Sequence, residues 1–374
     1  MSQRMSDSLS FDINCHQKTA EAILSFIDRH LNSSNHKRVE ELRLSHFACT
    51  DEATERVLHI AFASYRKVSL SQFFIGRECA QRIQLPPFVR SVSVEFLETT
   101  LSASIRDFLE SVLLQPRVVS LEVGLRGGVS YWCIDPATSA LVSSTTLQRL
   151  DCRECGKLHR TVVTGIVRLL ECNVLQSLSV QCSDAASAIS RVLAKCTTLR
   201  SLELYACADD DVVMAVCGAL LSNYTLRHLS LPYNRLSEST GSAVASMLRL
   251  NRGLHELNFS FTHIDGSSLW HDLLDAVEAN GSLLRVSVEG GTNANASRLA
   301  KFLKRNEQIK WTKERRNDII QKLFGLADLR LPSLVLIEVI QAMRPFYELI
   351  PYFRLMTVIN TVTDAAWRVT EKQL

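Results

Sequence analysis

The sequence lacks an apolar run long enough to cross a membrane, and the longest run near its end, 334–340, is interrupted by Glu338. The N-terminal stretch carries Arg4, Asp7 and Asp12 without an apolar core, so it does not resemble a secretory signal. The formal net charge over 374 residues is only +3, which is too small to favour a polyanionic partner. We therefore expect no membrane insertion, no export and no nucleic-acid partner.

Motifs that carry chemistry are also missing from the sequence. Cys152 and Cys155 have the spacing of metal ligands, but no second pair accompanies them, and a structural zinc site needs four ligands. There is no glycine-rich phosphate loop ending in Lys-Ser or Lys-Thr, no Gly-x-Ser-x-Gly elbow and no His-Glu-x-x-His. We predict that the protein is not an enzyme and binds no cofactor or metal, since catalysis would need a site assembled from dispersed residues.

The eleven cysteines are an odd number without clustered spacing. A secreted chain would be expected to pair its cysteines, whereas a reducing compartment leaves them as small, buried, apolar side chains. The cysteine usage therefore predicts a cytoplasmic protein.

A repeat of 24 to 29 residues is the strongest signal in the chain. Ten segments share the pattern apolar-x-x-apolar-x-apolar, and they are 39–44, 65–70, 89–94, 118–123, 147–152, 175–180, 199–204, 226–231, 254–259 and 283–288. The alternation at the end of each segment predicts a strand with one buried face. Apolar residues spaced by three and four follow, with Asp209, Ser237 or Asp265 placed to cap a helix.

These segments resemble leucine-rich repeats of the ribonuclease-inhibitor-like class, whose pattern continues to an Asn or Cys. That position holds Cys155, Cys207 and Asn234, with Ser183 and Thr262 as small polar substitutes. The early repeats depart from the pattern with Phe47, Phe73, Leu97 and Arg126, and the last has Gly291. The resemblance implies an α/β solenoid, a horseshoe with parallel strands on its concave face, helices on its convex face and helical caps at both ends.

Three regions are predicted along the chain. Residues 1–38 form an N-terminal cap with an amphipathic helix near 19–27, and residues 39–305 form a solenoid of about ten repeats. An aromatic insertion at 126–140 replaces much of one helix, either as a contact element or as an irregular repeat. Residues 306–374 form a C-terminal helical segment.

The C-terminal segment leaves two interpretations open. It is similar to an F-box, and the residues that carry the similarity are Leu331, Pro332, Val335, Ile337, Ile340, Pro345, Leu349, Val358 and Trp367. The resemblance implies that Leu331, Pro332, Val335, Ile337 and Leu349 contact the adaptor of a cullin ubiquitin ligase. The competing interpretation is a helical cap that seals the last repeat.

Polar strand positions are expected to line the concave face in columns rich in serine with mixed charge. Tyr205, Tyr233 and Phe261 follow three neighbouring strands and are predicted to lie near one another as aromatic anchors. The full set of predicted protein-binding residues is Glu122, Arg149, Asp151, Arg153, Glu203, Tyr205, His228, Tyr233, Glu256 and Phe261.

The sequence thus favours a non-enzymatic protein–protein interaction module, a scaffold or adaptor that holds a protein partner on the repeat face. The alternative is a substrate-recognition subunit of a cullin-type ubiquitin ligase that uses residues 331–367 to dock. A subunit of a larger assembly is compatible with both roles.

Overall fold

The structure is a computed structural model, and it divides the chain into two compact units, Met1–Leu299 and Ala300–Leu374. The residues that it describes are 9–32, 39–84, 86–97, 99–125, 141, 144–154, 158, 160–260, 263–264, 268–288 and 293–327. The predicted domain boundaries remain predictions, and the one after residue 305 falls inside helix α11 (Asn293–Ala327).

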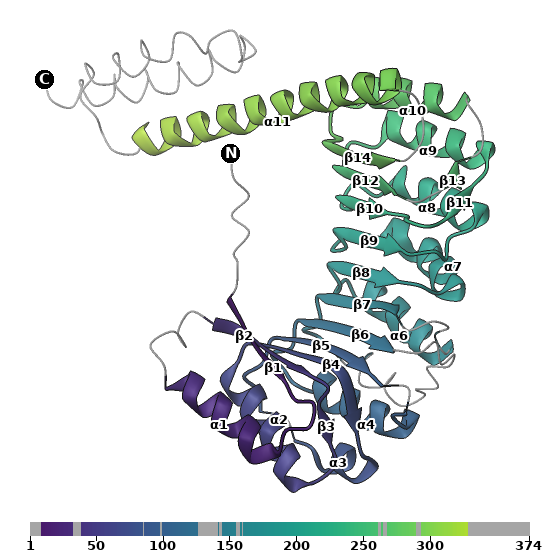
Figure 1. Cartoon of the computed structure of the whole chain (residues 1–374). Helices are drawn as coiled ribbons and strands as arrows, with labels where there is room; N and C mark the ends of the chain where they lie inside the picture. Colours follow the sequence, from purple (N-terminus) through teal and green to yellow (C-terminus); the bar gives the residue numbers. More distant parts are fainter. Residues whose placement is uncertain are drawn as a thin grey trace, which may run out of the picture. The chain divides into compact units, whose positions relative to one another are not determined.

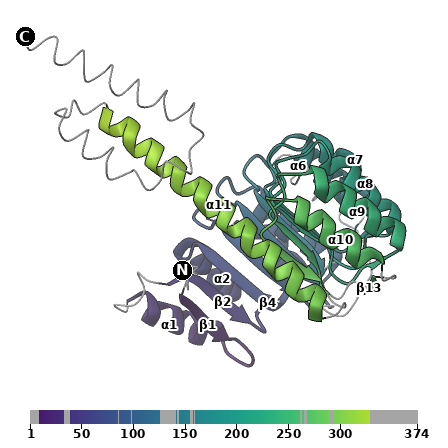
Figure 2. The ribbon, with the colours of Figure 1, turned by 90° about the horizontal axis from the view of Figure 1, so that it is seen from above.

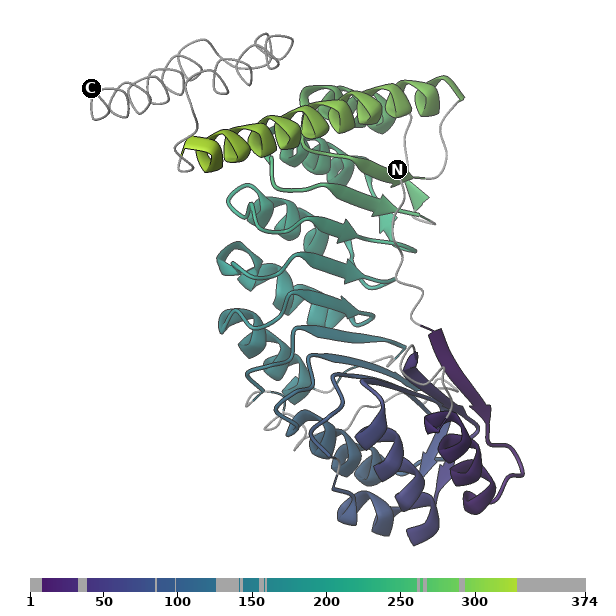
Figure 3. The same ribbon diagram turned by 90° about the vertical axis from the view of Figure 1, so that its left-hand side faces the viewer.

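The first unit is built on a parallel sheet of 12 described strands. In spatial order its main path is β1 (Leu9–Asn14), β2 (Val39–Ser45), β4 (Lys67–Ile75), β5 (Ser91–Phe96), β6 (Ser120–Leu125), β7 (Arg149–Glu154), β8 (Ser177–Val180), β9 (Ser201–Leu204), β10 (His228–Ser230), β12 (Glu256–Phe259) and β14 (Arg285–Val288). The short strand β3 (Ala48–Cys49) pairs with β4, while β11 (Arg235–Leu236) and β13 (His263–Ile264) form a separate pair. Along the main path, each strand lies beside the next one in the chain, as the colour gradient of Figure 3 shows.

Each of the ten predicted segments contributes one strand of this sheet, in chain order. The alternation of the pattern explains which strand residues are buried. Leu178 of β8, Leu202 of β9 and Leu229 of β10 point into the core, while the residues on either side of each leucine stay partly exposed. Each such leucine contributes about 2 kcal/mol of stability through burial. Repeats held together in this way depend on their neighbours, since a single strand and helix cannot cover their own apolar side chains.

Helices connect the successive strands. They are α1 (Ala20–Leu31), α2 (Glu52–Ser64), α3 (Arg77–Arg82), α4 (Ser102–Leu113), α6 (Arg160–Glu171), α7 (Ser183–Val192), the 3-10 turn η2 (Leu193–Lys195), α8 (Asp210–Leu220), α9 (Glu238–Leu250) and α10 (Ser268–Ala279). Figures 1 and 2 show α6 to α10 side by side along one face of the sheet. We call the opposite face, lined by the polar strand residues, the open face.

The N-terminal region contains a strand that the sequence analysis did not predict. The predicted helix is present as α1, capped by the Thr19 hydroxyl, which accepts a hydrogen bond from the Ala22 amide. Ahead of it, β1 pairs in parallel with β2 and adds another strand to the sheet. This region is therefore a strand and a helix rather than a helix alone.

The capping predictions hold at α8 and α9. The Asp209 carboxylate accepts from the Val212 amide at 2.9 Å, and the Ser237 hydroxyl accepts from Thr240 at 3.4 Å. Helix α4 differs, because Leu101 stands at its N-cap and supplies no side-chain hydrogen bond. The free amides in the first turn of α4 therefore receive no hydrogen bond from a capping side chain.

The early repeats bury a phenylalanine near the end of each strand: Phe47 follows β2, Phe73 lies within β4 and Phe96 ends β5. In the β5 repeat the buried ring is therefore one residue before the predicted Leu97, and it pairs with Phe73 across the sheet. Phe47, Phe73 and Phe96 are fully buried, and the ring of Phe73 lies 6.1 Å from that of Phe47 and 5.6 Å from that of Phe96. Phe108 of α4 packs 5.3 Å from Phe73. The departure from Asn or Cys in these repeats is thus a continuous aromatic stack.

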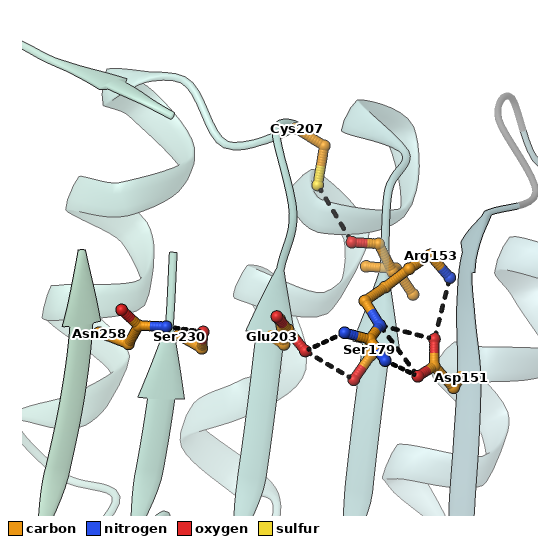
Figure 4. Close-up of polar contacts among 8 residues, drawn as sticks. Asp151, Arg153, Ser179, Glu203, Cys207, Ser230 and Asn258 are labelled. Carbon is orange, nitrogen blue, oxygen red and sulfur yellow. Dashed lines mark hydrogen bonds and ion pairs between the residues drawn. The ribbon is translucent and has the colours of Figure 1, made fainter. Parts of the chain in front are cut away.

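The later repeats use hydrogen bonds near the end of the strand, made by the residues at the Asn or Cys position. The Asn234 amide donates to the Leu204 carbonyl at 2.8 Å, and its oxygen accepts from Ala208 at 2.9 Å. The Cys207 thiol contacts the Val180 carbonyl oxygen at 3.6 Å, as Figure 4 shows.

One predicted member of this position is wrong. Ser183 does not take the inner position but is the exposed first residue of α7, and the buried side chain there is Cys182. The repeat interval is only 24 residues here, and α7 begins eight residues after the first position of its segment, whereas α8 begins eleven residues after that of the next. Cys155 and Thr262, and the departures Arg126 and Gly291, lie outside the described residues.

A second hydrogen-bonded ladder runs where the helices end. The Asn251 amide donates to the Leu220 and Asn223 carbonyls at 2.7 and 2.9 Å, and its oxygen accepts from the Gly253 and Leu254 amides. Asn223 and Asn280 make the equivalent contacts to the repeats before them, and all three side chains are buried. Each asparagine therefore ties two repeats together through their main chains.

Nine cysteines are described, all of them free, and every one except Cys172 is buried. Burial raises the pKa of the Cys207 thiol to about 11 and that of Cys217 to about 12. Buried thiols of this kind stay protonated and serve as small apolar side chains.

Candidate functional site

The strand register brings the predicted polar columns together on the open face. Every strand pairs with the next so that equivalent residues face each other, for example Glu122 with Asp151 and Ser179 with Glu203. The column that runs between the two buried positions holds Arg43, Ser69, Ser93, Glu122, Asp151, Ser179, Glu203, Ser230, Asn258 and Ser287. A partner that crosses the strands would meet these side chains one after another.

Ion pairs neutralise the N-terminal end of this face. The Glu41 carboxylate is only 3% exposed and lies within 3.2 Å of the Arg43 guanidinium and the Lys67 ammonium, and it accepts from the Ser69 hydroxyl at 2.7 Å. Burial alone would raise the pKa of this carboxyl, but the hydrogen bonds from its three neighbours outweigh burial and bring the pKa below its ordinary 4.5. The Glu41 charge is therefore used inside the fold.

The C-terminal end is balanced in a similar way. One oxygen of Glu256 lies 2.8 Å from His228 Nδ1, and the other lies 2.6 Å from the Arg285 guanidinium. His228 and Glu256 were predicted as partner-binding residues. The structure places both on the open face, where they and Arg285 form ion pairs that connect β10, β12 and β14.

Arg153 forms the central network of the face. Its guanidinium donates to both oxygens of Asp151, the shortest contact being 2.6 Å, and lies 3.4 Å from Glu203. Ser179 donates to the same Glu203 oxygen at 3.2 Å, which Figure 4 shows between the two strands. The hydrogen bond to Asp151, and secondarily the charges of Asp151 and Glu203, raise the pKa of Arg153 despite its partial burial.

A hollow of about 390 Å³ opens next to this network. Its walls come from the three consecutive strands β5, β6 and β7 and from the residues directly after β8 and β9, and they comprise Ser93, Val94, Glu95, Glu122, Val123, Gly124, Asp151, Arg153, Gln181 and Tyr205. Three of these residues are carboxylates and one is a guanidinium that already contacts a carboxylate. Glu122 makes no ion pair or hydrogen bond with the described part of the chain and is exposed.

Two tyrosines stand beside the hollow. The rings of Tyr205 and Tyr233 lie 4.9 Å apart at an angle of 42°, and Tyr233 is 48% exposed. Tyr233 has a φ of 58°, a left-handed conformation that costs a non-glycine residue free energy. The strand turn thus holds a partly exposed aromatic ring at some conformational cost. Phe261, predicted as the third aromatic, lies outside the described residues.

The predicted site residues therefore fall into groups. Glu122, Asp151, Arg153 and Tyr205 line the hollow, Glu203 pairs with Arg153 at its edge, and the ring of Tyr233 packs against that of Tyr205 at a tilt. Arg149 is an exposed member of the column before Asp151 and does not line the hollow.

Sequence reasoning missed Glu95 and Gln181 as lining residues. Both stand two positions after the Ser-rich column, where Arg153 and Tyr205 were already noticed, so the same spacing could have identified them. The predicted adaptor contacts Leu331, Pro332, Val335, Ile337 and Leu349 lie outside the described residues, as does the insertion 126–140.

Two further properties bear on the kind of site. Within the described ranges, no group of three or more His, Cys, Asp or Glu side chains is arranged to hold a metal ion. Over the same ranges, none of the helices combines the length and hydropathy required for a membrane span.

Comparisons with known proteins identify no family. No family model matches the sequence, and no curated protein matches it. Similar solved structures include leiomodin-1 actin-binding site 2 (20% identity, TM-score 0.39, 41% of this chain and 93% of that chain) and the Caenorhabditis elegans tropomodulin C-terminal domain (17%, 0.38, 42% and 98%). The yeast Rad7 and Elc1 complex matches at 16% identity and a TM-score of 0.48, over 75% of this chain and 69% of that chain.

The architecture of the first unit can be stated from its own geometry. Repeated segments of one sequence pattern each supply a strand, neighbouring strands pair in parallel, and helices alternate with them. This arrangement is that of a leucine-rich repeat fold.

Proposed function

We propose that this protein is a non-enzymatic scaffold that holds a protein partner on the open face of its sheet, across β5 to β9. The observation that carries the proposal is the hollow of about 390 Å³ bordered by the Tyr205–Tyr233 pair. Tyrosine and arginine are the side chains that contribute most often to the binding energy of protein interfaces, and concave sites give them water-excluded contacts.

The arrangement of charge supports binding rather than chemistry. Arg153 is held by hydrogen bonds to Asp151 and an ion pair with Glu203, and nearby serines leave space for larger partner residues.

The test compares two exposed tyrosine sites in the full chain. The double variant Tyr205→Ala/Tyr233→Ala removes the aromatic pair, while Tyr224→Ala removes a ring that is 51% exposed and does not line the hollow. Tagged wild-type and variant chains are used to capture proteins, a partner retained by wild type is purified, and its Kd is measured by titration calorimetry.

We expect the double variant to weaken the Kd at least tenfold, which corresponds to about 1.4 kcal/mol, and Tyr224→Ala to leave it within about twofold. Unfolding curves of the three chains establish that the loss is local. Equal affinity of wild type and double variant, with equal stability, would contradict the proposed surface.

Finer assignments extend this proposal. The ribonuclease-inhibitor-like class, the horseshoe shape with end caps and the cytoplasmic location rest on the repeat spacing, the resemblance and the cysteine usage described above. The alternative role in a cullin-type ubiquitin ligase rests on the F-box-like residues 331–367. Capture of cullin-complex subunits by the full chain, and not by a truncation ending at Arg305, would favour that alternative.

A further inference from the structure

The charges of the open face are unevenly distributed along the sheet. At the N-terminal end, the basic side chains of Arg43 and Lys67 offset Glu41, and at the other end Arg285 and His228 contact Glu256. Between them, the described side chains over β5 to β9 comprise four carboxylates against two guanidinium groups, namely Glu95, Glu122, Asp151 and Glu203 against Arg149 and Arg153. The middle of the face therefore carries an excess of negative charge.

The hollow lies within this excess. Glu95, Glu122 and Asp151 line it, and the only cation among its described lining residues, Arg153, is already engaged by two carboxylates. An incoming carboxylate or phosphate would meet three carboxylates and only one cation, whereas an incoming cation would meet an excess of negative charge.

The remaining walls fit a long side chain with a charged end. Gly124 presents only main chain to the hollow, and the side chains of Val94 and Val123 point into the core, so the apolar wall for an aliphatic stem is the ring of Tyr205. Tyr205 closes one side and leads to the exposed ring of Tyr233. Lysine and arginine bury such stems against apolar surface while their cationic ends remain among polar groups.

We propose that the hollow binds one lysine or arginine side chain from an exposed segment of the protein partner, with an adjacent apolar residue packed on the Tyr205–Tyr233 pair. This inference rests on the proposed scaffold function and specifies the chemistry of its partner. Glu122 and Glu95 supply the carboxylates that face the cation, and Asp151 contributes the one that it shares with Arg153.

The experiment uses the full chain and four fluorescein-labelled peptides. The peptides are identical nine-residue segments with a central Phe-X-Phe, where X is arginine, lysine, glutamine or glutamate, and binding is measured by fluorescence anisotropy. We expect the arginine and lysine peptides to bind at least tenfold more tightly than the glutamine peptide, and the glutamate peptide to bind most weakly. Higher salt should reduce this preference, because the carboxylates are partly exposed.

Two charge variants test whether the carboxylates of the hollow cause the preference for the cationic peptides. Glu95→Gln/Glu122→Gln removes two charges from the hollow, and Glu52→Gln/Glu171→Gln removes two from exposed helix positions outside it. We expect the first variant to weaken binding of the arginine peptide about tenfold without changing that of the glutamine peptide, and the second to change neither by more than about twofold.

The outcomes separate the two proposals. Equal binding of the arginine and glutamine peptides, or no binding of the arginine peptide at about 1 mM, overturns the cation inference. If the captured partner loses affinity on Tyr205→Ala/Tyr233→Ala but not on Glu95→Gln/Glu122→Gln, the scaffold function stands and the cation inference is wrong. If neither double variant affects the partner, both are wrong.

Discussion

In the repeats of β2, β4 and β5 the rings of Phe47, Phe73 and Phe96 are buried near the end of each strand, whereas Cys207 and Asn234 follow β9 and β10 and make hydrogen bonds there. The aromatic stack buries area without fixing the direction of any contact, so it tolerates small shifts between neighbouring repeats. Each asparagine contact instead joins particular main-chain atoms of adjacent repeats and defines their relative position. Adjacent repeats of one fold can thus be joined either by buried apolar area or by directional hydrogen bonds.

The hydrogen bonds of Asn234 lie next to the two tyrosines that border the hollow. Asn234 directly follows Tyr233, and its amide is bonded to the carbonyl of Leu204, the residue before Tyr205. The spacing of the two tyrosine rings is therefore set through the main chain. The comparison leads to four predictions, ordered from the largest expected effect to the smallest.

Phe73→Ala should have the largest effect, because it removes the ring that contacts Phe47, Phe96 and Phe108. We expect a loss of about 4 kcal/mol in the free energy of unfolding of the N-terminal repeats, measured by urea titration with hydrogen exchange. Phe88→Ala is the matched control, since Phe88 is 41% exposed and should lose less than about 1 kcal/mol. Similar losses for the two variants would show that the stack is not a stabilising element.

Asn251→Ala should have the second largest effect, because it leaves two carbonyls and two amides of the ladder without their partner. We expect a loss of about 3 kcal/mol and faster hydrogen exchange at the Gly253 and Leu254 amides. Asn32→Ala, at an exposed helix end, is the control and should change stability by less than about 0.5 kcal/mol. Unchanged exchange at both amides would exclude the ladder as a link between repeats.

The buried Glu41 carboxylate should make stability depend on pH. Its pKa is lower in the folded chain than its ordinary 4.5, so the stabilisation is present above that value and is lost as the pH falls through the folded pKa. Wild type should therefore lose stability more steeply on acidification below about pH 4.5 than Glu41→Gln does. Urea titrations between about pH 6 and pH 3 measure the two slopes, and parallel slopes would contradict the burial of the charge.

Leu101→Asp should give the smallest effect, and a favourable one. Leu101 is 59% exposed, has the extended conformation of an N-cap and supplies no hydrogen bond to α4. An aspartate there accepts from free amides and faces the positive end of the helix dipole, so we expect a gain of about 0.5 to 1 kcal/mol. Leu114→Asp at the other end of α4 is the matched control and should destabilise slightly; a change of the same sign in thermal denaturation would refute the capping argument.

The sequence predicted the strands well because one physical requirement repeats ten times. Residues such as Leu202 and Leu204 must alternate with polar residues wherever one face of a strand is buried, and the interval of 24 to 29 residues separates this signal from chance. Strand β1 was missed although Leu9, Phe11 and Ile13 alternate in the same way, because the apolar residue three positions ahead of the pair is absent there.

The site was predictable in part. The columns containing Glu122, Asp151 and Glu203 follow from strand periodicity, and their register follows from parallel pairing. The hollow was not predictable, because its depth depends on how the side chains of five repeats fill space between them, for example where Arg153 turns toward Asp151 and leaves Glu122 exposed. The ladder of Asn223, Asn251 and Asn280 was available in the sequence, since each asparagine stands three residues before the first leucine of a segment.

Because the strands pair in parallel and in register, equivalent side chains repeat at a constant spacing across the open face. Adjacent strands lie about 4.8 Å apart, while an α-helix advances 5.4 Å per turn, so a helix laid across the strands drifts by only about 0.6 Å at each one. Over the four intervals between β5 and β9 the accumulated offset is about 2.4 Å, less than half a turn. An extended chain advances about 6.6 Å for every second side chain and falls out of step sooner. The periodicity of this sheet therefore discriminates between partner shapes before any individual side chain does.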